Sequence, residues 1–375
     1  MSKVTMIGCD LHLRSILLQY CVGDSTPQQA SFVNDAAGRA KMIDLLLKFA
    51  EKHESKRIVF AYEASSLGYG LCDQLHECGI ECHVLSPTHL PKSAKQAKQK
   101  TDAKDAMMLL EVIRGHILAG NSLPAVWTPP QRLRDDRELV RARIDASDET
   151  TKIKLQILSM FKRRGVEKPD WYTTYWTKRF MKWLREVVTR MDEFVAPVLV
   201  NLIDRYELLV KHQAKLDKCL KKLSQLKRYK VAAEELRKLP GVGLLTAMTF
   251  LTEMGDLNRF QNRREIAAYL GLCPSSHESG ETNDRKGHIT RQGPSRVRKL
   301  LCQAAWVAIT RCPETSKDYD RIRGGKKNRT KKALVAIMRL LAIKMWHKAK
   351  ACGVDSELDG RGGPHSPELS RKPAA

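Results

Sequence analysis

Short apolar runs alternate with amphipathic segments over the first third of the chain. The runs are rich in β-branched and aromatic residues, which predicts strands, and the amphipathic segments repeat their apolar residues at helical spacing. A front hairpin followed by strand–helix–strand crossovers gives a mixed sheet with helices on its faces. The expected strands are residues 4–10, 15–22, 31–34, 57–62 and 80–85, and the expected helices are 37–52, a segment through Leu71 and Leu75, and 102–115.

The order strand, strand, strand, helix, strand, helix, strand, helix is that of an RNase H-like fold. We therefore expect an N-terminal RNase H-like domain at residues 1–120. Residues 121–130 form a plausible linker, because their prolines stop helices on both sides.

Helical spacing dominates from residue 131 onward, so the expected fold class is α/β plus all-α. Leu202, Leu209, Leu216 and Leu223 recur every seven residues, which fits an antiparallel helical hairpin, a dimer contact or an ordinary bundle helix. The expected regions are a helical, coiled-coil middle at 121–234, a mainly helical C-terminal domain at 235–350 and a disordered tail at 351–375.

An aromatic and basic segment lies in the middle region. Lysines and arginines are interspersed there with Trp171, Tyr172, Tyr175, Trp176 and Trp183. Such rings can stack on nucleobases, or they can form a helical core whose basic side chains reach the surface. The residues alone leave both interpretations open.

The C-terminal region begins with Leu-Pro-Gly-Val-Gly at 239–243, followed by an apolar helix. This pattern indicates a helix-hairpin-helix-like element, in which backbone N–H groups near Gly241 and Gly243 face a phosphate. The polar segment 273–293 has no helical period and is expected to be a functional loop. A core helix at 297–309, a basic loop at 321–332 and a last helix at 333–347 complete this region.

Four acidic residues occupy corresponding places in the N-terminal domain. Asp10 ends the first strand, Glu63 ends the fourth, and Asp102 and Asp105 open the last helix, three positions apart and therefore on one helix face. Because neighbouring strand ends meet at one edge of the sheet, we expect these carboxylates to converge. Clustered carboxylates require a cation, and their hard oxygens suit Mg²⁺ or Mn²⁺.

Composition points to a polyanionic partner. The chain of 375 residues has 66 lysines and arginines against 42 acidic residues, a formal net charge of +24. Nucleic acid is the usual partner of so basic a chain, and no apolar run predicts a membrane span. Besides Gly241 and Gly243, the residues expected to contact nucleic acid are basic: Lys100, Lys104, Arg285, Lys286, Arg291, Arg296 and Arg298.

The 10 scattered cysteines fit reduced thiols in a cytoplasm, and we expect no signal peptide before the first strand. His76, Cys78, Cys82 and His83 could be zinc ligands, but they fall where a helix ends and a strand begins, and there is no second Cys-x-x-Cys.

Taken together, these motifs resemble those of the DEDD-type transposases of the insertion sequence one-ten family, including its eleven-eleven subgroup. The likeness covers residues 4–345. The four acids match the tetrad of the family's RuvC-like domain, in Cys-Asp, Tyr-Glu-Ala and Lys-Thr-Asp-Ala-Lys-Asp. The C-terminal match runs through Leu-Pro-Gly-Val-Gly, Ala-Ala-Tyr-Leu-Gly-Leu-Cys-Pro, Ser279-Gly280 and Gly-His-Ile-Thr-Arg-Gln-Gly.

The resemblance implies DNA recombination through a covalent phosphoserine intermediate, with the metal-bound tetrad activating a serine that is otherwise a weak nucleophile. Ser279 is the expected nucleophile, and Ser275 and Ser276 remain alternatives. The implied partners are donor and target DNA, a structured guide RNA encoded by the element, and further copies of the chain in a dimer or tetramer. The implied location is the cytoplasm, at the nucleoid.

Two other functions remain open on the residues alone. A RuvC-like, structure-specific nuclease such as a junction resolvase would use water and need the four acids but not Ser279. A non-enzymatic nucleic-acid-binding protein would use the acids only structurally.

Overall fold

The computed structural model describes residues 3–90, 101–171, 174–279 and 282–353, with only the main chain described at 276–279 and 282–286. The chain forms two compact units that divide between Pro130 and Gln131. Each unit is considered by itself.

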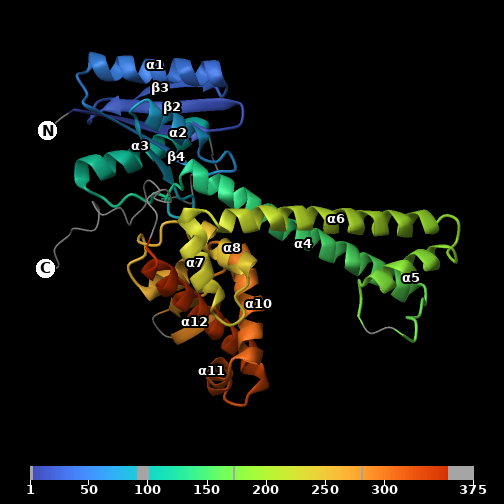
Figure 1. Cartoon of the computed structure of the whole chain (residues 1–375). Coiled ribbons are helices and arrows are strands. Elements are labelled where there is room, and N and C mark those ends of the chain that lie inside the picture. The colour runs from blue at the N-terminus through green and yellow to red at the C-terminus, as the bar shows by residue number, and fades with distance from the viewer. Residues whose placement is uncertain (1–2, 91–100, 172–173, 280–281, 354–375) are drawn as a thin grey trace. The chain divides into compact units, whose positions relative to one another are not determined.

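The first unit is built on a five-stranded mixed sheet, as the apolar runs predicted (Figure 1). The strand order is β3-β2-β1-β4-β5. β1 pairs with β2, and β2 with β3, in antiparallel fashion, whereas β1 pairs with β4, and β4 with β5, in parallel. The strands are β1 (Val4–Leu11), β2 (Ser15–Val22), β3 (Gln28–Val33), β4 (Arg57–Glu63) and β5 (Glu81–Leu85).

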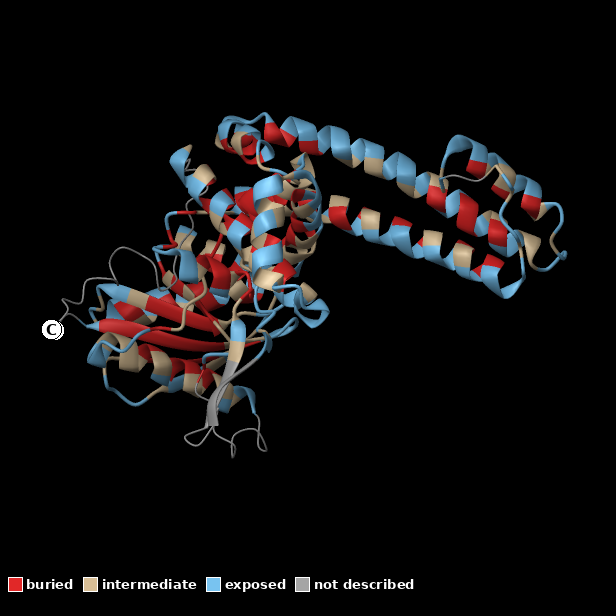
Figure 2. Cartoon of the chain, turned by 90° about the horizontal axis from the view of Figure 1, so that it is seen from below, coloured by how far each residue is buried: buried red, intermediate tan, exposed pale blue. Residues whose placement is uncertain are grey.

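Helices cover both faces of this sheet. α1 (Ala36–Lys52) and α2 (Gly70–Glu77) bury their apolar sides against one face, together with Ile7 and Cys9 of β1. α3 (Asp102–Ala119) packs on the other face, against Met6. The central strands are buried along most of their length (Figure 2), because both faces are covered.

The second unit begins with a long helical hairpin. α4 (Gln131–Arg163) and α6 (Ala196–Ser224) lie side by side and antiparallel, with α5 (Lys178–Val188) packed near the far end (Figure 1). The seven-residue leucine repeat on α6 thus serves an intrachain hairpin.

The aromatic segment forms the core at the far end of this hairpin. The ring of Trp176 packs on Tyr206 at a centroid distance of 5.0 Å, and the ring of Trp183 packs on Phe161 at 5.7 Å. Phe180 is completely buried. Of the two interpretations left open, the structure therefore favours a hydrophobic core for Tyr175, Trp176 and Trp183. The ring of Trp171 instead lies 4.0 Å from the Arg179 guanidinium, and Tyr172 lies outside the described residues.

Further helices make up the rest of the second unit, around a small hairpin of two strands. Their bounds are α7 (Lys227–Arg237), α8 (Leu244–Met254), α9 (Arg263–Tyr269), β6 (Pro274–Ser279), β7 (Thr282–Ile289), α10 (Ser295–Arg311), α11 (Pro313–Arg323), the 3-10 turn η2 (Lys327–Arg329) and α12 (Thr330–Ala351). Residues 354–375, most of the expected disordered tail, lie outside the described part of the chain.

Two expectations for this region were wrong. The polar segment expected to be a loop contains the antiparallel pair β6–β7. Main-chain hydrogen bonds join the two strands. The segment has no apolar alternation from which strands could have been predicted. The basic loop expected at 321–332 is shorter than expected: α11 runs to Arg323, α12 begins at Thr330, and residues 324–329, which include the 3-10 turn η2, connect the two helices. Lysine and arginine are good helix formers, so a high density of charge is a poor indicator of a loop.

Candidate functional site

The two strand-terminal acids belong to adjacent parallel strands. β1 and β4 pair with Cys9 opposite Tyr62, so Asp10 and Glu63 are the next residues at the same end of both strands. Cys9 and Tyr62 are buried in the core shared with α1 and α2. Because side chains alternate between faces of a sheet, Asp10 and Glu63 project toward the opposite face, which α3 covers.

Gly8 allows α3 to approach that face closely. A β-carbon at position 8 would overlap the carbonyl oxygen of Ala106 and lie 2.9 Å from the Cα atom of Leu110. Gly8 precedes Asp10 by two residues and so lies on the same face of β1. Ala106 directly follows Asp105, so the close approach brings the first turn of α3 to Asp10.

The first turn of α3 presents two further carboxylates. Thr101 caps the helix, its side-chain oxygen accepting a hydrogen bond from the backbone N–H of Lys104 at 3.4 Å. Asp102 and Asp105 follow at the N-terminal end, where the helix dipole favours negative charge.

His12, which sequence reasoning missed, lies between two of these acids. Its Nε2 is 3.1 Å from Oδ2 of Asp10 and 3.6 Å from Oδ1 of Asp102. Ligand atoms of the three residues lie within 4.8 Å of one another, the one such group of His, Cys, Asp or Glu among the described residues. The turn after β1 sets its position, since Asn34 donates to the His12 carbonyl oxygen at 2.7 Å. A histidine two residues after a strand-terminal aspartate was the available signal.

Burial raises the pKa of Asp10, and the nearby carboxylates of Asp102 and Asp105 raise it further, while His12 opposes them. The side chain of Asp10 is 17% exposed and that of Asp102 is 56% exposed, so the desolvation falls on Asp10. The structure thus brings Asp10 and Asp102 together, holds Asp105 within electrostatic reach, and sets Glu63 beside Asp10 along the parallel strands.

This donor set fits a hard divalent cation. Carboxylate oxygens dominate it, they concentrate negative charge in one place, and a histidine already lies between two of them. The cysteines and histidines whose positions in the sequence argued against a zinc site have other surroundings: Cys82 is buried, and Nε2 of His83 lies 2.8 Å from Oε1 of Glu81.

The candidate nucleophile lies in the second unit. Ser279 is the last residue of β6 and pairs with Thr282 of β7. Ser275, one of the alternatives, uses its hydroxyl to donate a hydrogen bond to the His288 carbonyl oxygen at 3.1 Å. Ser276 and Ser279 are among the residues described by main chain alone.

The base of the β6–β7 hairpin is held by Arg298 of α10. Its Nη1 donates to the carbonyl oxygens of Leu270 at 3.2 Å, Gln292 at 2.6 Å and Gly293 at 3.1 Å, and so contacts both ends of the hairpin. Burial lowers the pKa of the Arg298 guanidinium, and the charge of Arg291 lowers it further. Gly293 has a φ of +70°, and a β-carbon there would overlap the carbonyl oxygen of Tyr269, so the two ends lie in close contact.

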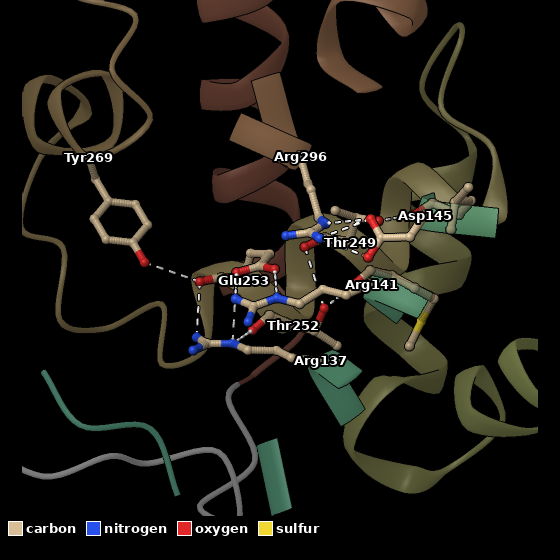
Figure 3. A network of polar contacts seen from close by, with 10 residues as sticks. Arg137, Arg141, Asp145, Thr249, Thr252, Glu253, Tyr269 and Arg296 are labelled. Carbon is tan, nitrogen blue, oxygen red and sulfur yellow. Dashed lines mark hydrogen bonds and ion pairs between the residues drawn. The ribbon is translucent and has the colours of Figure 1, made fainter. Parts of the chain in front are cut away.

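A network of ion pairs and hydrogen bonds joins the N-terminal half of α4 to α8, α9 and α10 (Figure 3). Arg141 forms two hydrogen bonds with the buried carboxylate of Glu253, at 2.7 and 2.9 Å. Arg137 donates to the Thr252 carbonyl oxygen at 2.6 Å, and the Tyr269 hydroxyl donates to that of Glu253 at 3.2 Å.

Several residues expected to contact nucleic acid also make contacts within the protein. Arg296 is paired with Asp145, its Nη2 lying 2.9 Å from each carboxylate oxygen (Figure 3). Gly241 has a φ of +80° and lies against the backbone of Ala304, which lets the turn between α7 and α8 pack on α10. Gly243 precedes α8, and a β-carbon built there would have no neighbour within 4 Å.

The other expected contacts differ in how far they are described. Arg291 lies two residues after the end of β7 and has a φ of +57°. Lys104 lies in the first turn of α3. Lys100 lies outside the described residues, and Arg285 and Lys286 are described by main chain alone.

No helix in the described ranges has the length and apolar character needed to cross a membrane.

Comparison with known proteins covers both units. The family model for DEDD transposases of the IS110 type, described as "Transposase", matches residues 13–164. The model described as "Transposase IS116/IS110/IS902 family" matches residues 233–321. The first match begins three residues after Asp10, and the second includes Ser279.

Relatives of known sequence agree with these models. A putative transposase, y4qE, of Sinorhizobium fredii is 32% identical over 281 residues, which are 73% of this chain and 63% of that protein. The transposase for insertion sequence element IS1533 of Leptospira borgpetersenii is 24% identical, over 82% of this chain and 86% of its own length. The pilin gene-inverting protein of Moraxella bovis is 24% identical, over 91% of this chain and 94% of its own length. The chain belongs to the IS110 family of transposases.

Proposed function

We propose that this protein is a DNA recombinase of an insertion sequence, which cuts and rejoins DNA through Ser279. The observation that carries the proposal is the meeting of Asp10 and Asp102, 92 residues apart in sequence, within 4.8 Å of each other and of His12. In a family of transposases, such a cluster suits a phosphodiester substrate whose reaction develops negative charge. Its position at the strand ends of a sheet ordered β3-β2-β1-β4-β5 agrees with the RNase H-like domain expected from the sequence.

Asp10, Glu63, Asp102 and Asp105 would hold divalent cations, for which we propose Mg²⁺ or Mn²⁺. When bound, such ions stabilise the attacking and leaving oxygens of an in-line phosphoryl displacement. Asp10 would orient the ion from the rigid end of β1, and Asp102 and Asp105 from the first turn of α3. Glu63 completes the set from the end of β4.

Ser279 would attack the phosphorus atom of the scissile phosphodiester. A bond forms between the serine oxygen and phosphorus while the bond from phosphorus to one deoxyribose oxygen breaks. The serine proton passes to a base, and the leaving oxygen takes up a proton. A free deoxyribose hydroxyl can later reverse this step on a new strand, releasing the serine.

The relatives' names favour rejoining over simple hydrolysis. A protein that inverts a pilin gene must reseal both ends, as must a transposase that inserts its element. A phosphoserine link preserves the phosphodiester energy for resealing, whereas attack by water would lose it. For that reason we favour Ser279 over the water-using junction resolvase.

The partners follow from the same proposal. Donor and target DNA would be held by at least two copies of the chain, because two DNA sites must meet. A net charge of +24 suits binding to a structured guide RNA as well, and base pairing by that RNA would supply the sequence choice. Such a reaction belongs in the cytoplasm, at the nucleoid.

The test compares Ser279→Ala and Asp10→Asn with the wild-type protein, purified with any bound RNA, on end-labelled DNA with Mg²⁺. We expect a covalent protein–DNA adduct, stable in detergent, from the wild type alone. Ser275→Ala and Ser276→Ala are the controls and should retain it. Cleavage by Ser279→Ala but not by Asp10→Asn would instead establish a water-using nuclease. Sequencing the co-purified RNA tests the guide, and absence of any specific RNA would remove that part alone.

A further inference from the structure

The outer side of α6 carries a row of four lysines. Lys211, Lys215, Lys218 and Lys222 are spaced four, three and four residues apart, and all are exposed. At 3.6 residues per turn they fall within an arc of about 60° on the helix surface. We call these four residues the lysine stripe.

The lysine stripe faces away from the partner helix. The side of α6 that contacts α4 includes Gln213, which donates to the Ala146 carbonyl oxygen at 2.8 Å, and Asp217, which pairs with Arg143 at 2.6 Å. Gln213 and Asp217 lie on the opposite side of the helix from the stripe, given the helical period. The stripe is therefore presented outward from the hairpin and does not support its packing.

The acidic residues of α6 nearest the stripe already have arginine partners. Glu207, four residues before Lys211, pairs with Arg185 at 2.8 Å, and Asp217, the one acidic residue between 208 and 224, pairs with Arg143. Among the described residues, none of the four lysines has an ion-pair partner. Lys48 and Lys238, in contrast, pair with acids three or four residues away. Like charges at this spacing destabilise a helix, and a solvated helix face normally mixes both signs.

The dimensions of the stripe suit a DNA backbone. Lys211 and Lys222 are eleven residue steps apart, or about 16 Å at 1.5 Å per step. One strand of duplex DNA presents a phosphate every 3.4 Å or so along its axis, hence about five phosphates over that length. Long lysine side chains can each reach one of them as point charges.

We infer that the lysine stripe is a docking surface for the backbone of duplex DNA. The inference rests on the proposed function, since it takes DNA as the substrate. It adds a contact on α6, a helix that contributes neither the acidic cluster nor the β6–β7 hairpin. Contacts of this kind position DNA without reading its sequence.

The experiment replaces all four lysines, as Lys211→Gln, Lys215→Gln, Lys218→Gln and Lys222→Gln together. The matched control removes four exposed lysines outside the stripe, as Lys41→Gln, Lys52→Gln and Lys56→Gln in the first unit together with Lys317→Gln in α11. Both variants lower the net charge equally. Binding of a random-sequence DNA duplex is measured over a range of salt concentrations, and thermal unfolding confirms that both variants fold.

Loss of four phosphate contacts should lower the magnitude of the slope of log K against log salt concentration by about three to four, at about 0.9 per phosphate, and weaken binding at least roughly tenfold. The control should change the slope by less than about one. Equal effects of both variants would overturn the inference. So would a loss of binding to structured RNA with duplex binding intact. Adduct formation through Ser279 with an unchanged slope would leave the proposed function standing and remove the stripe alone.

Discussion

At the scale of single residues, Asp10 shows how the fold creates a demand for a cation. Its carboxylate ends a buried strand, and the first turn of α3 adds two acids beside it. Burial raises the pKa of Asp10 in the folded protein, so ionisation there opposes folding. His12 partly compensates, and a divalent cation would do so more fully.

Asp10→Asn is therefore expected to stabilise the protein in the absence of divalent ions. As the pH rises past the ordinary aspartate pKa of about 3.9, the unfolded chain loses its proton before the folded protein does. The free energy of unfolding of the wild type consequently falls until Asp10 ionises in the folded state. Asp10→Asn lacks this loss, so its advantage in urea denaturation should grow between acidic and neutral pH. Added Mg²⁺ should stabilise the wild type more than the variant.

Asp24→Asn, which replaces an exposed aspartate of the same unit, serves as the control and should show no such growth. An Asp10→Asn protein that is less stable than the wild type at neutral pH without metal would contradict the argument.

At the scale of elements, the position of α3 on β1 depends on a missing side chain. Gly8 lies against the backbone of Ala106 and Leu110, and the next residue on that face of β1 is Asp10. The same contact therefore packs the core and sets the distance between Asp10 and the acids of α3.

Gly8→Ala is expected to cost about 1–3 kcal/mol of the free energy of unfolding, because an added methyl group overpacks a tight contact. It should also reduce adduct formation, since α3 must move away from β1. Gly70→Ala is the matched control: that glycine begins α2, and a β-carbon there would have no neighbour within 4 Å. Urea denaturation of both variants measures the difference, and equal stabilities would disprove the role given to Gly8.

The β6–β7 hairpin likewise depends on a residue outside it. Arg298 was expected from the sequence to contact nucleic acid, but its guanidinium bonds three carbonyl oxygens at the hairpin base. Arg298 can therefore be a positioning residue for Ser279.

Arg298→Ala should slow adduct formation much more than it weakens DNA binding. If Arg298 only held the hairpin, the salt dependence of DNA binding would stay nearly constant. If it contacted a phosphate, the salt slope would fall by about one. Arg263→Ala removes an exposed arginine of the same unit and controls for the lost charge. Unchanged adduct formation in Arg298→Ala, or a slope lowered well beyond that of Arg263→Ala, would rule out a purely positioning role.

At the scale of the whole molecule, the basic residues are of two kinds: some are ion-paired and others are not. Around the N-terminal half of α4, arginines pair with acids: Arg141 pairs with Glu253, and Arg296 pairs with Asp145. The net charge of +24 therefore comes largely from residues outside such pairs, including the lysine stripe. A buried pair such as Arg141 and Glu253 fixes the relative positions of helices, whereas unpaired exposed lysines remain available to a polyanion.

Local sequence patterns were enough to predict the mixed sheet, the helical middle and the positions of the four acids along the chain. Each rests on local patterns: two-residue and helical apolar periods, strand-terminal positions, and an i, i+3 pair at a helix start. The sequence did not reveal the β6–β7 hairpin, because main-chain pairing leaves no mark on the spacing of apolar residues. It also made the basic loop at 321–332 too long, because α11 and α12 take up both ends of that segment.

Only the tertiary structure decided which residues meet. Gly8 contacts α3, and His12 lies between Asp10 and Asp102. Arg298 bonds the base of the hairpin. These contacts join residues that no periodic pattern in the sequence connects. Whether a basic side chain is paired also depends on the folded chain: Arg296 is paired because folding brings Asp145 to it, although the two residues are far apart in sequence.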